Sequence, residues 1–213
     1  QTRGVPMGQD CVSPARHSAF STPNELMAFI AELRQLSGGK PVGFKLCIGQ
    51  PWEFMGMVKA MMDTGILPDF VVVDGAEGGT GASPLEFSDH LGMPMREGLL
   101  FVHNTLVGTG LRDRIRIGAA GKIVSAFDIA ATRALGADWV NAARGFMFAL
   151  GCIQSLSCNT NRCPVGVATQ NPELRARFSG KPEFVETFFE YIAEEVRELL
   201  AQLGFRSIEE AVG

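Results

Sequence analysis

The sequence lacks any apolar run long enough to span a membrane, and its N-terminus lacks the basic, apolar and small-residue order of a secretory signal. Its 19 basic residues are scattered and the formal net charge is -4, so no surface for nucleic acid or an anionic membrane is predicted. The five cysteines do not form the disulfide framework of a small secreted protein. These absences favour a globular protein of the cytoplasm.

The first 40 residues are predicted to be a lead-in segment followed by one helix. The chain begins with Gln1 rather than Met, so we expect a fragment or a processed chain. Regular periodicity starts at Asn24, and apolar residues then recur at helical spacing as far as Leu36. Thr22 or Asn24 is the expected helix cap.

Residues 41–150 repeat a pattern of short apolar strand, small-residue turn and helix, which predicts parallel βα units. Four units are half of a (β/α)₈ barrel, which typically has about 250 residues, or a small open sheet with helices on both faces. The predicted strands are Val42–Ile48, Asp69–Val73, Arg114–Ala119 and Trp139–Ala142, and the predicted helices are Pro51–Thr64, Met95–Val107, Ser125–Leu135 and Gly145–Gln154.

Three cysteines stand close together in residues 151–170. Cys152, Cys158 and Cys163 fall within twelve residues, and their odd number does not suit a disulfide pairing. The CxxC spacing of a structural zinc ribbon is missing. Thiolates are the usual ligands of iron–sulfur clusters, and a Cys-Pro ending such as Cys163-Pro164 is common there. The pattern favours a three-ligand cluster over the alternative of three buried, unliganded thiols.

Small-residue turns follow the predicted strands. The segment 74–84 holds four glycines in eleven residues, and such a backbone either approaches an anion or a flat ring closely or forms a flexible surface loop. The turns 119–122 and 142–145 each carry a cation and are predicted to lead into helix N-termini, which bind phosphate readily.

The C-terminal part, residues 171–213, is predicted to be helical. Apolar residues recur at helical spacing from Phe184 to Leu203, opposite a row of glutamates. This pattern predicts an amphipathic packing helix. His17, His90 and His103 have no ligand spacing among themselves, so we expect no metal site from them.

Five motifs of this chain resemble the FMN-binding synthase domain of glutamate synthase, in the family's order and over the chain from about Pro41 onwards. The motifs are Gly78–Pro84, Ala149–Cys152, Cys163–Gln170, Ala193–Arg197 and Leu203–Ser207. The resemblance implies an FMN-bearing (β/α)₈ TIM barrel, with this chain, 1–213, as a partial domain holding strands five to eight and a C-terminal helix. It also implies a 3Fe-4S cluster on the three cysteines.

The resemblance assigns roles to particular residues. Lys45 matches the lysine near the flavin pyrimidine ring, where a cation stabilises the reduced flavin. Gln50 and the turn with Gly75, Gly78, Gly79 and Thr80 are expected beside the ring or the substrate, with Lys45 and Gln50 as the catalytic residues. The phosphate-binding positions are Ala120, Gly121, Lys122, Ala143, Arg144 and Gly145.

The implied reaction is the reductive amination of 2-oxoglutarate to glutamate, with ammonia or glutamine as nitrogen source and a ferredoxin or an electron-donor subunit as partner. The stretch after Ile48 differs from the long enzymes and is closer to a shorter, synthase-like flavoprotein. The alternatives are a related FMN oxidoreductase acting on another small acid and a non-catalytic iron–sulfur or zinc-binding scaffold. Because half of a barrel exposes strand edges, we also expect an oligomer or association with the missing half.

Overall fold

A computed structural model describes residues 6–10, 12, 16–79, 83 and 86–213. Its centre is a four-stranded parallel sheet in the order β1-β2-β3-β4. The strands are β1 (Gly43–Cys47), β2 (Phe70–Asp74), β3 (Arg116–Ala120) and β4 (Trp139–Asn141). The helices are α1 (Pro23–Leu36), α2 (Pro51–Thr64), α3 (Met95–Gly108), α4 (Ala126–Ala134), α5 (Ala143–Ala149), α6 (Pro172–Arg175) and α7 (Pro182–Leu203), with a 3-10 helix η1 (Glu209–Ala211).

The predicted order of strands and helices is confirmed, with strand ends shifted by one or two residues. Local signals explain the boundaries. Thr22 caps α1 in a reciprocal capping box with Glu25, and Gly65 ends α2 in the left-handed conformation at φ 69°. Ser125 and Asp128 form the same kind of box at the start of α4.

The predicted helix Gly145–Gln154 is wrong at both ends. Helix α5 begins at Ala143 and ends at Ala149, because Gly151 takes a positive φ of 89° just beyond the C-cap Leu150. A left-handed glycine at this place terminates a helix. The short helices α6 and η1 were not predicted, since four and three residues give no readable periodicity.

One face of the sheet is packed against the helices. Val71, Val73, Ile117 and Ala119 point from the central strands into one core, where they meet apolar side chains of α1, α2 and α3, and Ile129 of α4 packs on the same core. Because all four helices share this core, they lie on one side of the sheet. The alternative of an open sheet with helices on both faces is therefore wrong for the described residues.

The other face of the sheet remains open. Lys45 and Cys47 are exposed there, and Phe70 and Trp139 are half-buried with their rings packed edge to face at 5.8 Å. A Cβ on Gly118 would overlap the Trp139 indole, so glycine is needed beneath that ring. In a closed barrel this face would line the interior. The fold is thus an α/β partial barrel.

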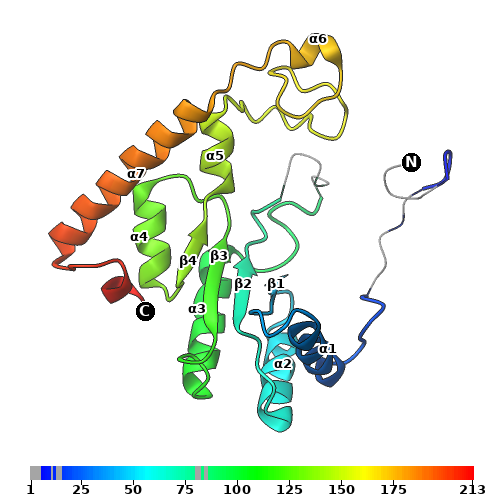
Figure 1. Ribbon diagram of the computed structural model, residues 1–213, viewed down its shortest axis with the longest axis vertical. Helices are drawn as coiled ribbons and strands as arrows, with labels where there is room; N and C mark the ends of the chain where they lie inside the picture. The colour runs from blue at the N-terminus through cyan, green and yellow to red at the C-terminus, as the bar shows by residue number, and fades with distance from the viewer. Residues whose placement is uncertain (1–5, 11, 13–15, 80–82, 84–85) are drawn as a thin grey trace.

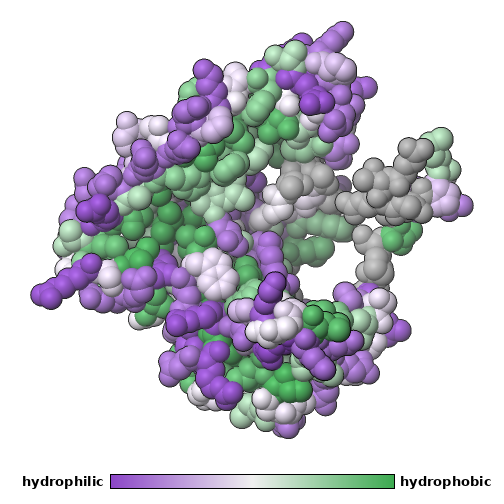
Figure 2. Space-filling view, in the orientation of Figure 1, coloured by the Kyte–Doolittle hydropathy of each residue, from purple (hydrophilic) through white to green (hydrophobic). Residues whose placement is uncertain are grey.

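Helix α7 forms a second layer outside the barrel strands. Its buried Ile192, Val196 and Leu200 pack on Ala126 of α4 and on Ala211 of η1. Figure 2 shows polar side chains along the outer edge of α7 and apolar side chains between α7 and α4. The predicted amphipathic packing helix is confirmed. No helix in the described ranges is both long and apolar enough to cross a membrane.

Candidate functional site

The carboxyl ends of the four strands form one row. Cys47, Asp74, Ala120 and Asn141 are the last strand residues, and the register pairs each with the next. In Figure 1 the strand arrows point toward the end of the molecule that holds α5, the cysteine loop and α6. The predicted flavin-binding turns follow this row directly. Ligands of parallel α/β folds bind at this edge, so the topology brings the candidate residues to one end.

Lys45 points onto the open face beneath this row. Its Nζ lies 2.8 Å from Oδ2 of Asp74, and 54% of the side chain is exposed. Phe44 and Leu46 face the core, while Lys45 alternates to the other side, as strand geometry requires. The sequence pointed to Lys45 but not to its partner Asp74.

Gly75 and Gly121 let two loops close over the start of α3. The N–H of Gly75 donates to the Ala120 carbonyl at 2.9 Å, and a Cβ on either glycine would meet the Met95 side chain at 2.6 Å. Glu77 completes this junction, since both of its carboxylate oxygens lie 3.0 Å from the Met95 N–H. Its negative charge lies at the positive N-terminal end of α3. Sequence reasoning missed Glu77, which sits in the glycine-rich turn.

The glycine-rich turn is tight where the structure describes it. The N–H of Gly78 donates to the Gly75 carbonyl at 2.9 Å, and Gly79 has a φ of 88° that other residues adopt rarely. Thr80, predicted to lie beside the ring, falls outside the described residues. Gln50 is the exposed N-cap residue of α2, and its side chain makes no capping bond.

The two predicted phosphate turns differ in construction. Ala143 is the first residue of α5, so that turn leads directly into a helix. The other turn does not, because α4 starts only at Ala126, where Ser125 already accepts from the N–H of Asp128. Lys122 lies upstream with a φ of 50°. The prediction that both turns open helices is thus right for one of them.

Among the described residues, the contacts of the two cations in these turns lie at the surface. Lys122 Nζ lies 3.1 Å from Asp89, and both side chains are about half exposed. Arg144 makes one long contact of 3.5 Å to the Gly79 carbonyl. Gly145 is buried, and a Cβ there would lie 3.1 Å from the ring of Phe188, so it lets α7 pack on α5. Lys122 and Arg144 therefore keep donors available for an anion.

Cys47 lies at the same edge of the sheet. Its side chain is partly exposed, and the partial burial of the sulfur raises the pKa of its thiol, with the nearby carboxylates of Asp74 and Glu77 acting in the same direction. A Cβ on Gly92 would lie 2.5 Å from its Sγ, so the returning loop passes close to it. This cysteine is separate from the predicted cluster.

The three clustered cysteines follow α5 in a loop that leads to α6. None of them forms a disulfide: Cys152 is half-buried, Cys158 is exposed, and Cys163 is only 5% exposed. Burial opposes ionisation of Cys163, but backbone N–H groups of residues 165–168 outweigh it and lower the pKa of its thiol. Among the described residues, no three His, Cys, Asp or Glu side chains are arranged to hold one metal ion.

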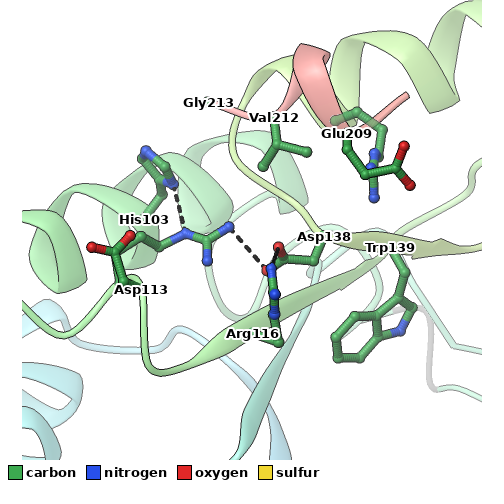
Figure 3. Close-up of a pocket in the computed structure, with 10 residues that line it drawn as sticks. His103, Asp113, Arg116, Asp138, Trp139, Glu209, Val212 and Gly213 are labelled. Atoms are coloured by element: carbon green, nitrogen blue, oxygen red, sulfur yellow. Dashed lines mark hydrogen bonds and ion pairs between the residues drawn. The ribbon is translucent and has the colours of Figure 1, made fainter. Parts of the chain in front are cut away.

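A pocket of about 730 Å³ lies at the opposite end of the sheet, where β3 and β4 begin (Figure 3). Three of its charged side chains, Arg112, Arg116 and Asp138, pair with one another. Asp138 lies 2.9 Å from both Arg112 and Arg116 and accepts from the N–H of Ile117 at 2.7 Å, and His103 accepts from Arg112 at 3.3 Å. Charges at the N-terminal face of barrels serve stability rather than chemistry. We therefore place the candidate site at the other end.

Comparison with known proteins gives one matching family model, described as the conserved region in glutamate synthase, over residues 1–206. A glutamate synthase large subunit-like protein, YerD, of Bacillus subtilis is 46% identical over 177 residues, covering 83% of this chain and 34% of that protein. The NADPH glutamate synthase large chain of the same species is 37% identical, and the match covers 99% of this chain and 14% of that protein. Ferredoxin-dependent glutamate synthase 1 of Arabidopsis thaliana is 38% identical, covering 99% and 12%. The chain thus spans between 12% and 34% of the length of these relatives.

Solved structures share the fold at lower identity. A flavocytochrome b2 mutant with pyruvate bound matches with a TM-score of 0.53 and 20% identity, covering 85% of this chain and 36% of that one. A dihydroorotate dehydrogenase from Eimeria tenella, in complex with ferulenol, matches with a TM-score of 0.50 and 14% identity, covering 90% and 48%. In each case the chain corresponds to less than half of the longer structure, as a partial barrel would.

Proposed function

The chain belongs to the glutamate synthase family, and on this premise we propose that it supplies the second half of an FMN-binding barrel in a glutamate synthase-type oxidoreductase. The observation that carries the proposal is the row of strand ends. Cys47, Asp74, Ala120 and Asn141 stand side by side at one edge, with Lys45 on the open face below them. This is where a barrel binds its ligand.

Lys45 is the proposed partner of the flavin pyrimidine ring. Its ammonium lies on the face that a closed barrel would enclose, and half of its surface is free to meet a ligand. Bound FMN would supply the hydride chemistry, while the protein tunes it through nearby charge. The cation at Lys45 would stabilise negative charge on the reduced ring. Gln50, at the entry to α2, is proposed to contact the substrate side of the same ring.

The backbone of Gly121 and the side chains of Lys122 and Arg144 are proposed to hold the FMN phosphate. Exposed ion pairs such as Lys122–Asp89 contribute only about 0–1 kcal/mol, so exchanging Asp89 for a phosphate costs little. Within the part of the chain that the structure describes, Arg144 makes one long hydrogen bond, and its planar guanidinium suits bidentate contact with phosphate. The side chains of Ala120 and Ala143 are small, so they leave room for the phosphate to approach the backbone of the two turns.

Cys152, Cys158 and Cys163 are proposed to bind a 3Fe-4S cluster that passes single electrons. The donor set fits such a cluster because all three thiols are free and each would bind a different iron. The lowered pKa of Cys163 supports the thiolate form that a metal requires. Zinc fits less well, because structural zinc takes four ligands around a single ion.

The proposed reaction is the reductive amination of 2-oxoglutarate, with nitrogen from ammonia or glutamine and electrons from a ferredoxin or a partner subunit. The names of two relatives, ferredoxin-dependent and NADPH glutamate synthase, support these electron sources. A second candidate is the reduction of another small acid. This candidate is supported by the 46% identity to the large subunit-like protein YerD, which is higher than the identity to the NADPH and ferredoxin-dependent synthases named above.

The test uses the full-length, flavin-loaded protein that contains this chain, reduced anaerobically with dithionite. Adding 2-oxoglutarate should reoxidise the flavin and yield one glutamate per reduced flavin with ammonium, and two with glutamine, because glutamine becomes glutamate when it gives up its amide nitrogen. A flavin that stays reduced with both nitrogen sources, yet is reoxidised by another keto acid, would replace the proposed substrate. Loss of turnover without loss of flavin in Gln50→Ala would support the place given to Gln50.

A further inference from the structure

The loop that carries Cys163 is closed by a clamp between two residues that flank it. The hydroxyl of Thr169 lies 2.7 Å from the backbone oxygen of Asn161 and 2.8 Å from its Oδ1. The N–H of Gln170 donates to the same Oδ1 at 2.7 Å. Asn161 and Thr169 are eight residues apart, and Cys163 lies between them. Two or more short hydrogen bonds therefore join the ends of this segment.

The Thr169 side of the clamp is buried, whereas Asn161 lies at the surface. Thr169 is only 9% exposed, so its hydroxyl depends on protein partners rather than on water. Asn161 adopts a left-handed φ of 61°, which asparagine tolerates better than most residues. This conformation lets the backbone oxygen and the amide oxygen of one residue meet the same hydroxyl. Replacing Thr169 with an apolar residue removes the hydroxyl that contacts both oxygens of Asn161.

The clamp is anchored to the first turn of α6. The N–H of Asn171 donates to Thr169 Oγ1 at 3.1 Å, and Asn171 Oδ1 accepts from the N–H groups of Glu173 and Leu174 at 2.9 and 3.2 Å. The chain from Asn161 to α6 thus forms one connected polar network, so movement of the loop would break several bonds together.

The turn after Cys163 is packed against the same helix. Gly166 has a φ of 78°, its N–H donates to the Cys163 carbonyl at 3.2 Å, and a Cβ there would overlap the Leu174 carbonyl. The buried Cys163 is therefore held on one side by this turn and on the other by the clamp. Cys158 lies outside the clamped segment and is exposed.

We propose that Asn161 and Thr169 are positioning residues that fix the Cys163 turn in its cluster-binding conformation before iron arrives. The proposal rests on the iron–sulfur site proposed above. Neither residue is a ligand; both act through Cys163. The clamped thiol would be the fixed point of the site, to which Cys152 and the exposed Cys158 close when the cluster is inserted.

The experiment compares the full-length protein with Thr169→Val, Thr169→Ser and Thr160→Val. Valine keeps the shape of Thr169 but removes its hydroxyl, and serine restores the hydroxyl. Thr160 is the matched control, because it lies in the same loop and its hydroxyl bonds only local backbone at 2.9 Å. Two readouts are taken: the alkylation rate of Cys163 in the cluster-free protein, measured by mass spectrometry, and iron and sulfide per chain with the electron paramagnetic resonance signal after anaerobic reconstitution.

Thr169→Val should alkylate Cys163 about tenfold faster, as expected for loss of a buried hydrogen bond. It should also bind less than half as much iron as the unmodified protein, and Thr169→Ser should restore both values. Thr160→Val should change neither. Asn161→Gly keeps the positive φ and the backbone oxygen that Thr169 contacts, but it removes the amide oxygen. It should change both values in the same direction as Thr169→Val by a smaller amount, and it serves if that variant does not fold.

Equal alkylation rates and iron contents in Thr169→Val, Asn161→Gly and the unmodified protein would overturn the clamp. An equal loss of iron in Thr160→Val would also overturn it, since the effect would then be general to the loop. If the unmodified protein binds no iron under any condition, the iron–sulfur site fails and the clamp's role toward it fails with it. If the unmodified protein binds iron, and Thr169→Val and Asn161→Gly bind the same amount, the iron–sulfur site stands and the clamp alone is rejected.

Discussion

The Lys45 ammonium lies 2.8 Å from the Asp74 carboxylate, across the neighbouring strands β1 and β2, on the open face of the sheet. The pair places a cation and an anion together just below the row of strand ends. Because Asp74 is paired with Lys45, it sets where the ammonium lies relative to a ligand bound at that edge. The properties of a bound flavin are therefore sensitive to both residues.

Replacing Lys45 with methionine should lower the reduction potential of the bound flavin in the full-length protein. Removing the cation destabilises negative charge on the reduced ring, and we expect a shift on the order of 30 mV, which is about 1.4 kcal/mol for a two-electron couple. The matched control is Lys59→Met, which breaks an exposed pair with Asp63 on α2. An unchanged potential in Lys45→Met, with flavin retained, would rule out the placement of Lys45.

Protein made anaerobically should contain iron and acid-labile sulfide but no stoichiometric zinc. Changing any one of Cys152, Cys158 or Cys163 to serine should lower the iron content, because a cluster with three protein ligands cannot lose one without weakening. Cys47→Ser should leave the iron content unchanged, since that thiol lies at the sheet edge. Zinc without sulfide, measured by metal analysis, would contradict the assignment.

Asp138→Ala should be strongly destabilising. Asp138 pairs with Arg112 in a site where both side chains are only 12–13% exposed, and its loss leaves a buried cation uncompensated. Breaking such a pair costs about 3–5 kcal/mol of unfolding free energy, measurable by urea denaturation. Glu194→Ala removes an exposed partner of Arg197 and should cost no more than about 1 kcal/mol. Similar costs for the two variants would show that the Asp138 pair is not buried in solution.

Stability should fall as the pH drops below about 6.5, partly through His103. Burial, together with the charge of Arg112, lowers the pKa of His103 in the folded state despite the opposing charge of Asp138. A group with a lowered folded pKa contributes stability above its unfolded pKa and loses it as the pH falls toward the folded value. His103→Gln should flatten the urea stability profile between pH 7 and 5. The exposed His90→Gln should not, and a profile unchanged in His103→Gln would reject the assignment.

The regular elements were predictable because their signals are local. Helix α2 follows from Pro51 at its first position and Gly65 after its last, and the alternation of Phe44, Lys45 and Leu46 follows from strand geometry. The partners of the candidate residues could not be predicted in this way. Asp74 meets Lys45, and Asp89 meets Lys122, only because the register and a long loop bring distant segments together. Likewise, the bond between Asn161 and Thr169 depends on a loop without periodicity.

The most direct test of the half-barrel account is a titration of FMN into the purified 213-residue chain, followed by flavin fluorescence and light scattering on the same sample. The open face around Lys45 and the outer edges of β1 and β4 would be covered in a closed barrel by further strands. The account predicts that the chain alone associates and binds FMN weakly or not at all, because the remaining wall of the flavin site is missing. A monodisperse monomer that binds FMN tightly would contradict it.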